Sequence, residues 1–218
     1  MASVSYDDYL VIGIAGHARS GKDTAAQYIQ KLNQKHDFAS RVIVKSFAEP
    51  LKVVVTSVMR DLVPNDISVS AYAYLETLKN NNQELNGINI RKALQQVGSV
   101  FRSMNDNIFV EILIAKIRNI LANYEPAGGK TVFIIPDTRF KVEEDLLRKE
   151  FGDKYVLIKV GRPEIDEKAA RGEPPYDHVS EKQIDMLTPD VSIMNDGSLE
   201  GLEAKIEKTT LKIIKLKT

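Results

Sequence analysis

The feature that most constrains the fold is a buried strand that runs directly into a glycine-rich turn and then into a helix. Residues Tyr9–Ala15 read YLVIGIA, a nearly continuous apolar run typical of a strand buried on both faces of a parallel sheet. Residues Gly16–Lys22 read GHARSGK, and apolar residues at helical spacing then predict a helix over Thr24–Leu32. A strand, a glycine turn, a lysine and a helix in this order predict an α/β protein with a phosphate-binding loop, or P-loop.

The turn itself has the residues that phosphate binding needs. Its glycines let successive backbone N–H groups point into one concavity, and the start of the following helix adds its positive end. The lysine is expected to reach the β- and γ-phosphates as a mobile point charge. The usual loop places Ser or Thr next as a magnesium ligand, but this chain has Asp23 followed by Thr24, so either can serve. Arg19 is a phosphate contact or a solvated side chain. The predicted donor-binding residues are Gly16, Ala18, Arg19, Ser20, Gly21, Lys22, Asp23 and Thr24.

Alternating strand and helix patterns extend over the rest of the chain. They predict one domain, residues 1–218, with a five-stranded, mostly parallel sheet and helices on both faces. Residues 48–127 are expected to form a helical insertion, and the polar stretch 161–188 a mobile lid. The remaining strands are expected at residues 41–47, 131–135, 155–160 and 190–194. Helices are expected at 50–62, 72–79, 90–104, 108–121, 142–151 and from 198 onwards.

Three charged side chains near predicted strand ends are candidates for binding a phosphoryl group or stabilising its charge during transfer. Arg139 lies just past a strand's carboxyl end, the edge where open parallel sheets build their sites, and a guanidinium can grip phosphate bidentately. A surface ion pair with Glu143 is the alternative for Arg139. Asp137 could orient magnesium-bound water or a phosphate, or it could cap a turn. Arg162 follows another strand end and could neutralise transition-state charge from the lid.

Composition excludes several other classes of function. Thirty basic residues balance thirty acidic ones, so neither nucleic acid nor an anionic membrane is expected as a partner. The chain has no cysteine and only three widely separated histidines, which argues against disulfides, thiolate catalysis and a zinc site. No secretory signal pattern is present, and the apolar runs are too short to span a bilayer.

Several segments together resemble the deoxynucleoside monophosphate kinases of bacteriophages. The loop residues Ser20–Thr24 are similar to that family's version, with Asp-Thr after the lysine. Matching segments follow in the family's order through most of the chain from about residue 9. They are Phe47–Lys52, Arg91–Gly98, Pro136–Arg139, His178–Glu181 and Asn195–Leu199.

The resemblance implies a P-loop kinase fold, Mg-ATP as phosphoryl donor and a deoxynucleoside monophosphate as acceptor. It further implies that Lys52, Arg91 and Arg102, with Arg139, bind the acceptor, although Lys52 could belong to a helix start and Arg102 to a solvated helix face. It also implies residence in the cytoplasm of an infected host cell, and it leaves a homodimer open. Three alternatives remain: a kinase for another small acceptor (phosphomevalonate, dephospho-coenzyme A or a ribonucleotide), an ATP-dependent switch module, and an inactive nucleotide binder.

Overall fold

The structure is a computed structural model that describes residues 9–64, 68–123, 129–174 and 176–217. The other residues of the predicted domain 1–218, insertion 48–127 and lid 161–188 lie outside the described part. The chain divides into two compact units. We call Met1–Ser46 with Leu113–Thr218 the sheet unit, and Phe47–Ile112 the helical unit.

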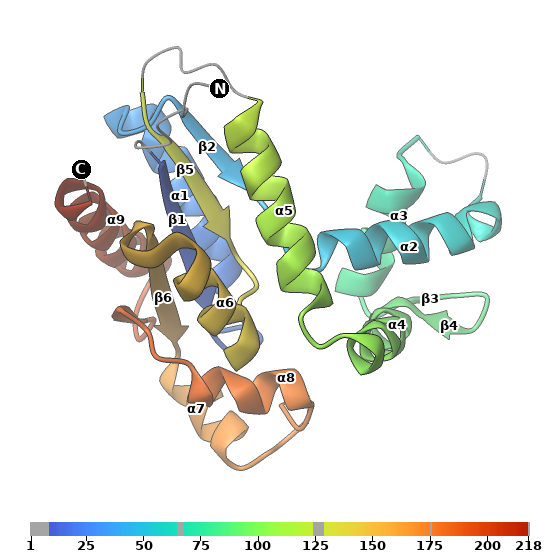
Figure 1. Cartoon of the computed structure of the whole chain (residues 1–218). Helices are drawn as coiled ribbons and strands as arrows, with labels where there is room; N and C mark the ends of the chain where they lie inside the picture. Colours follow the sequence, from blue (N-terminus) through green and yellow to red (C-terminus); the bar gives the residue numbers. More distant parts are fainter. Residues whose placement is uncertain (1–8, 65–67, 124–128, 175, 218) are drawn as a thin grey trace. The chain divides into compact units, whose positions relative to one another are not determined.

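The sheet unit contains a five-stranded sheet in the order β2-β5-β1-β6-β7, and each of the four strand pairings is parallel (Figure 1). The central strand, β1, pairs through Val11 with Phe133 on one side and with Tyr155 on the other. Because all the strands run in one direction, their carboxyl ends lie along the same edge. The strands are β1 (Tyr9–Ala15), β2 (Arg41–Val44), β5 (Thr131–Ile135), β6 (Tyr155–Gly161) and β7 (Val191–Met194).

Helices cover both faces of this sheet, as the sequence predicts (Figure 1). On one face, α1 (Lys22–His36) packs beside α9 (Leu199–Leu216). On the other face, α6 (Lys141–Phe151) packs against β6, and the Phe151 ring meets Tyr9 edge-on. The remaining helical segments are α5 (Ile108–Ala122), which begins in the helical unit, α7 (Pro163–Ala170), α8 (Val179–Lys182) and two 3₁₀ turns, Gly152–Lys154 and Gln183–Met186.

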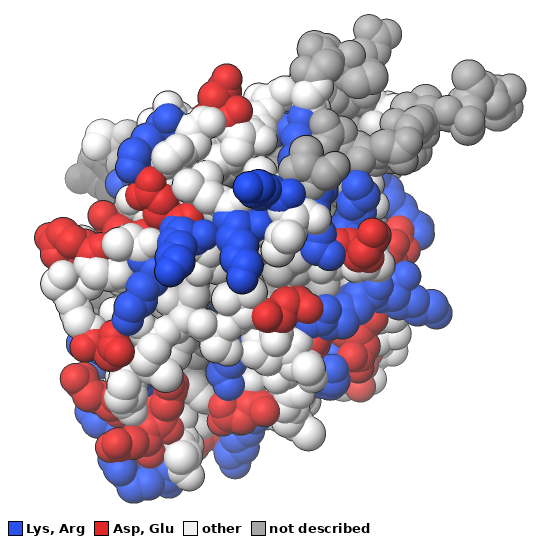
Figure 2. All heavy atoms as spheres, turned by 90° about the vertical axis from the view of Figure 1, so that its left-hand side faces the viewer, with Lys and Arg blue, Asp and Glu red and all other residues white. Residues whose placement is uncertain are grey.

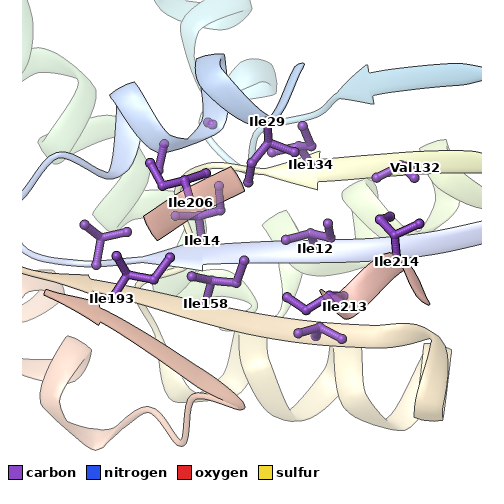
Figure 3. Packing of buried hydrophobic residues seen from close by; sticks show 14 of the residues in the cluster. Ile12, Ile14, Ile29, Val132, Ile134, Ile158, Ile193, Ile206, Ile213 and Ile214 are labelled. Carbon is purple, nitrogen blue, oxygen red and sulfur yellow. The ribbon is translucent and has the colours of Figure 1, made fainter. Parts of the chain in front are cut away.

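The core between the sheet and helices α1 and α9 follows from the two-residue repeat of the strands. Ile12 and Ile14 point to the same face of β1 and meet Ile29 of α1 and Ile206 of α9 (Figure 3). The side chains of this cluster are almost completely buried, and at about 25 cal/mol per Å² of apolar surface they supply a large part of the folding free energy. This packed frame fixes the strand ends from which the candidate site is built.

The helical unit has a smaller core of its own. Val55 and Met59 of α2 pack with Leu75 of α3 and Ile90 of α4. A two-stranded hairpin, β3 with β4, joins α3 to α4; the sequence predicted only loops there. These two-residue strands lie in a polar, asparagine-rich segment and show no apolar alternation, so the sequence does not indicate them. The elements are α2 (Glu49–Met59), a 3₁₀ turn (Arg60–Leu62), α3 (Ala71–Asn80), β3 (Glu84–Leu85), β4 (Ile88–Asn89) and α4 (Ile90–Met104).

One predicted boundary needs correction. β2 ends at Val44 rather than at Phe47, and Lys45 makes a backbone bond to β5, to the Ile134 carbonyl at 2.9 Å. Helices α7 and α8 lie within residues 161–188, the predicted lid. No helix in the described part of the chain is both long enough and apolar enough to cross a membrane. Lys and Arg side chains lie among Asp and Glu side chains on the face drawn in Figure 2.

Candidate phosphate-binding site

The loop between β1 and α1 is a compact turn whose backbone only glycine can follow at two positions. Gly16 has φ 152°, and a Cβ there would lie 2.4 Å from the Val160 carbonyl oxygen. Gly21 has φ 103°, and a Cβ there would lie 2.7 Å from Nδ2 of Asn195. Arg19 also has a positive φ, 68°, and its side chain is exposed. The loop therefore has the tight, left-handed backbone expected of a phosphate cradle.

Asn195 fixes the loop from the neighbouring sheet edge. Its Nδ2 donates to the Ser20 carbonyl at 2.9 Å, while its own backbone N–H donates to the Gly161 carbonyl at 2.7 Å. The residue follows β7 directly, so the outermost parallel strand holds the loop in place. Asn195, the first residue of the Asn195–Leu199 family segment, therefore holds the loop in place, a role that the sequence alone did not indicate.

Lys22 is the first residue of α1, and only 5% of it is exposed. Its Nζ lies 3.6 Å from Oδ2 of Asp23, whose side chain is 76% exposed. Burial lowers the pKa of Lys22, the Arg139 charge lowers it further, and the carboxylates of Asp23 and Glu181 oppose both effects. A buried amine whose charge is opposed by a second cation is an arrangement that favours an anionic ligand.

Arg139 lies four residues past the end of β5, and its side chain is 32% exposed. Its Nη1 donates to Oε1 of Glu181 at 2.7 Å. The sequence offered Glu143 as an ion-pair partner, but the Glu143 carboxylate accepts the backbone N–H groups of Arg139 and Phe140, at 2.9 and 3.1 Å. Glu143 thus caps the start of α6, and the guanidinium is directed toward the loop instead.

Glu181 connects Arg139 to the loop and is itself nearly buried, with 5% of its side chain exposed. Its Oε2 accepts the backbone N–H of Ala18 at 3.0 Å and lies 3.3 Å from Nδ1 of His17. The other ring nitrogen of His17 lies 3.3 Å from Oδ1 of Asp185. Burial opposes the ionised form of Glu181, but the His17 bond and the Arg139 charge hold its pKa below the ordinary value.

The other predicted residues of the sheet unit also lie at or near strand ends. Asp137 accepts a hydrogen bond from Ser46 Oγ at 2.6 Å, which joins the segments that follow β5 and β2. Arg162 follows β6 and is the N-cap of α7; its side chain is 44% exposed, with Nε 3.6 Å from Glu164. Thr24 lies in the first turn of α1, beside Asp23.

The predicted acceptor ligands Lys52, Arg91 and Arg102 all lie in the helical unit, on α2 and α4. Arg91 is exposed, and the Arg102 guanidinium lies 5.1 Å from the centre of the Phe109 ring. Lys52 Nζ is 3.1 Å from Glu76 and 5.9 Å from the Tyr72 ring centre. The Lys52, Tyr72 and Glu76 side chains line a very small hollow of about 10 Å³ whose floor is apolar.

Comparison with known proteins identifies the family. The family model described as "Deoxynucleotide monophosphate kinase" matches residues 40–206, well over half of the chain. The chain belongs to the deoxynucleotide monophosphate kinase family. It is therefore an ATP-dependent phosphotransferase with the P-loop kinase fold, as the sequence predicts. A search of curated proteins finds no match.

Solved structures similar to this kinase include other small-molecule kinases, all at low identity. An APS kinase from Mycobacterium tuberculosis is 13% identical, with 96% of each chain covered and a TM-score of 0.38. A gluconokinase from Sinorhizobium meliloti is 11% identical, with 95% of this chain and 94% of that chain covered and a TM-score of 0.44. A dephospho-CoA kinase from Campylobacter jejuni is 10% identical, with coverages of 94% and 97% and a TM-score of 0.45.

Sequence reasoning missed several residues that support the kinase's loop. Tyr176 is buried, its ring meets His17 edge-on, and its hydroxyl donates to the Ala18 carbonyl at 3.4 Å. The role of Glu181 was missed too, although the His178–Glu181 segment was among the family matches. His178 caps α8 through Nδ1, which accepts from Ser180 N at 3.2 Å. Only the family segment could have pointed to Glu181; no signal pointed to Tyr176.

Proposed function

We propose that this kinase transfers the γ-phosphoryl group of Mg-ATP to a deoxynucleoside 5′-monophosphate, giving ADP and a deoxynucleoside diphosphate. The observation that carries the proposal is that Lys22 begins the helix after the glycine loop while Arg139 is joined to the same loop through Glu181, which accepts both its Nη1 and the Ala18 N–H. Two phosphate-bearing substrates repel each other, so an enzyme that joins them needs fixed cations where they meet. Family membership supports the nucleotide class of the substrates.

The donor would bind along the loop. The backbone N–H groups from Gly21 to Thr24 would cradle its phosphates, since those of Ala18 and Ser20 already donate to Glu181 and to the His17 carbonyl. Lys22 would lie against the β- and γ-phosphates. A phosphate oxygen of the acceptor attacks the γ-phosphorus, and the bond from that phosphorus to the β–γ bridging oxygen breaks. The acceptor phosphate is already ionised at neutral pH, so the protein needs no strong base. Arg139 would hold the transferring group, and Arg162 would add charge from α7.

The residues present fit a magnesium ion that travels with ATP. Mg²⁺ in kinase sites takes one or two protein oxygens and completes its shell with water and substrate phosphates. Asp23 and Thr24 offer a carboxylate and a hydroxyl at the start of α1, and Asp137 offers a second carboxylate. In the described part of the chain no three His, Asp or Glu side chains form a protein cage, which agrees with this mode of binding. The ion would supply charge neutralisation on the phosphates.

Lys52, Arg91 and Arg102 of the helical unit are the proposed acceptor ligands of that unit. Arg91 is exposed on α4 and accessible to a phosphate. A phage origin and action in the host cytoplasm remain predictions from the sequence.

The test is a coupled assay of ADP release with Mg-ATP and each of dAMP, dGMP, dCMP and dTMP, beside the four ribonucleotides. Turnover with some deoxynucleotides is expected, and Lys22→Ala should lower it by at least about 10²-fold because a preorganised charge is lost. Lys31→Ala, an exposed lysine of the same helix, is the matched control. Folded, ATP-binding protein that shows no turnover with any of them would contradict the proposal and direct the search to other small phosphorylated acceptors.

A further inference from the structure

Glu181 occupies an unusual position for a residue that the proposed reaction does not use. It is a nearly buried carboxylate from the predicted lid, and it contacts two parts of the site that are far apart in sequence. One oxygen is bonded to the P-loop at Ala18, and the other to Arg139. A single rigid group therefore sets the distance between the loop that would carry the donor and the guanidinium that would meet the transferred group.

The charges around Glu181 explain why a carboxylate is needed here. Arg139 carries a positive charge beside the P-loop, and the Glu181 carboxylate accepts from its Nη1 at 2.7 Å while also accepting the Ala18 N–H of the loop at 3.0 Å. Without this anion, the guanidinium would lose its bond to the loop in the absence of nucleotide. With it, the guanidinium is held in place, so no reorganisation is needed when charge develops during transfer.

The far side of Glu181 is also fixed. His17 lies between Glu181 and Asp185, and Asp185 in turn accepts a bond from Lys159 Nζ at 2.9 Å. The ring of Tyr176 packs edge-on against His17. These neighbours limit the movement of the carboxylate. A fixed carboxylate can in turn hold the Arg139 guanidinium in place.

We propose that Glu181 is a positioning residue for phosphoryl transfer: it holds the Arg139 guanidinium at a fixed place relative to the P-loop. The inference rests on the proposed function, in which Arg139 touches the transferred group. An arginine has five N–H donors, so the bond to Glu181 leaves others for a phosphate. Misplacement of such a group by about 1 Å can cost about 10²-fold in rate.

The first test compares Glu181→Gln with wild type for kcat, KM of the acceptor and the dissociation constant of ATP. The amide keeps the size and can still accept the Ala18 N–H, but it cannot anchor a guanidinium as a carboxylate does. We expect kcat to fall about 10- to 100-fold, while ATP binds equally well or more tightly because a negative charge beside the phosphates is gone. Glu167→Gln, an exposed glutamate of α7, is the matched control and should change neither quantity.

The second test is a double-mutant cycle with Arg139→Ala, which separates positioning from a general structural role. If Glu181 acts through Arg139, Glu181→Gln should cost little further activity once Arg139 is already alanine. Full additivity of the two losses in kcat, or unchanged kcat in Glu181→Gln, would overturn the inference. Thermal unfolding of each variant shows whether it remains folded; if Glu181→Gln does not, Glu181→Asp, which is one methylene too short to reach both partners, takes its place in the cycle.

The proposed function and the positioning role of Glu181 can be contradicted by different results. If wild-type protein does not phosphorylate any deoxynucleotide, or if Arg139→Ala is fully active, the proposed function or the role of Arg139 is wrong. If wild type is active and Arg139→Ala is impaired while Glu181→Gln is not, only the role of Glu181 is wrong.

Discussion

Arg139 illustrates how burial and charge select a role for one side chain. Its guanidinium is about one-third exposed, while the carboxylate that it pairs with is nearly buried. A buried carboxylate is stable only when it is paired, and Glu181 has Arg139, His17 and the Ala18 N–H. The exposed part of Arg139 remains available for a ligand.

Replacing Arg139 by alanine should lower turnover or acceptor affinity far more than ATP affinity. The reason is that the P-loop and Lys22, which would hold the donor, keep their own contacts. Steady-state kinetics with each substrate varied, together with direct ATP binding, measures this difference. Arg118→Ala is the matched control, because Arg118 forms an exposed pair with Glu150 at 2.5 and 2.6 Å. A loss confined to ATP affinity would instead place Arg139 at the donor.

His17 should make stability depend on pH near neutrality. Burial opposes its protonation, but the Glu181 bond and the Asp185 charge outweigh burial and raise its pKa above 6.5. A raised pKa in the folded state stabilises the fold fully below the unfolded value of about 6.5, and that contribution is lost as pH rises through the folded pKa.

Comparison of wild type with His17→Gln by urea unfolding between pH 5 and pH 9 tests this expectation. The advantage of wild type in free energy of unfolding should be largest at the acid end and should shrink as pH rises. Asp166 and Lys159 also face this network, and their charges act on it. The series should therefore be run at constant ionic strength, so that screening of these charges does not change with pH. A difference that grows with pH would contradict the assignment.

At the scale of elements, strong local patterns were predictable and weak ones were not. The apolar run of β1, the four apolar residues of β5 and the helical pattern from residue 198 onwards gave elements close to those observed. The β3–β4 hairpin was not predictable, because two-residue strands carry no periodicity. Helices α7 and α8 were missed because they are short and largely polar, and because prolines and glycines lie in the stretch around them.

The backbone conformation of Gly21 in the P-loop can be tested by substitution. Gly21→Ala should lower both stability and ATP affinity, because the residue has φ 103° and its Cβ would lie 2.7 Å from Asn195 Nδ2. Left-handed strain alone costs about 1–3 kcal/mol, and the steric contact adds to it. Gly152→Ala is the control, since φ is also positive there, 53°, but no atom lies within 4 Å of the added Cβ. Equal effects of the two substitutions on ATP affinity would show that Asn195 does not support the loop.

For the whole molecule, the sheet unit and the helical unit differ in the size of their cores. Among the described residues, seventeen buried side chains form the cluster between the sheet, α1 and α9, whereas seven form the cluster of the helical unit. Less buried apolar surface gives a lower free energy of local opening. The helical unit carries the predicted acceptor ligands, so lower stability there is compatible with adjustment to a substrate.

Native-state hydrogen exchange should therefore show lower opening free energies for α2, α3 and α4 than for β1 and β5. Leu75→Ala, in the helical core, should accelerate exchange in α2–α4 and leave β1 and β5 protected. Exchange of both units at the same free energy would mean that they unfold as one cooperative body.

The candidate site was predictable where residues follow strands, and not where distant segments meet. Lys22 and Arg139 were placed correctly at the sheet edge, because the carboxyl ends of parallel strands come together. The network of Glu181, His17 and Tyr176 joins the loop to a segment about 160 residues later in the chain, and no local pattern contains such a contact.

The strand order has a consequence for synthesis on the ribosome. β1 is made first, yet both of its neighbours, β5 and β6, begin more than 115 residues later, and the Asn195 clamp on the P-loop is made later still. The apolar segment Tyr9–Ala15 must therefore wait without its sheet partners while most of the chain emerges. Such a segment can pair with other chains during this delay, so production at low temperature, or with chaperones that cover apolar segments, should raise the yield of folded kinase.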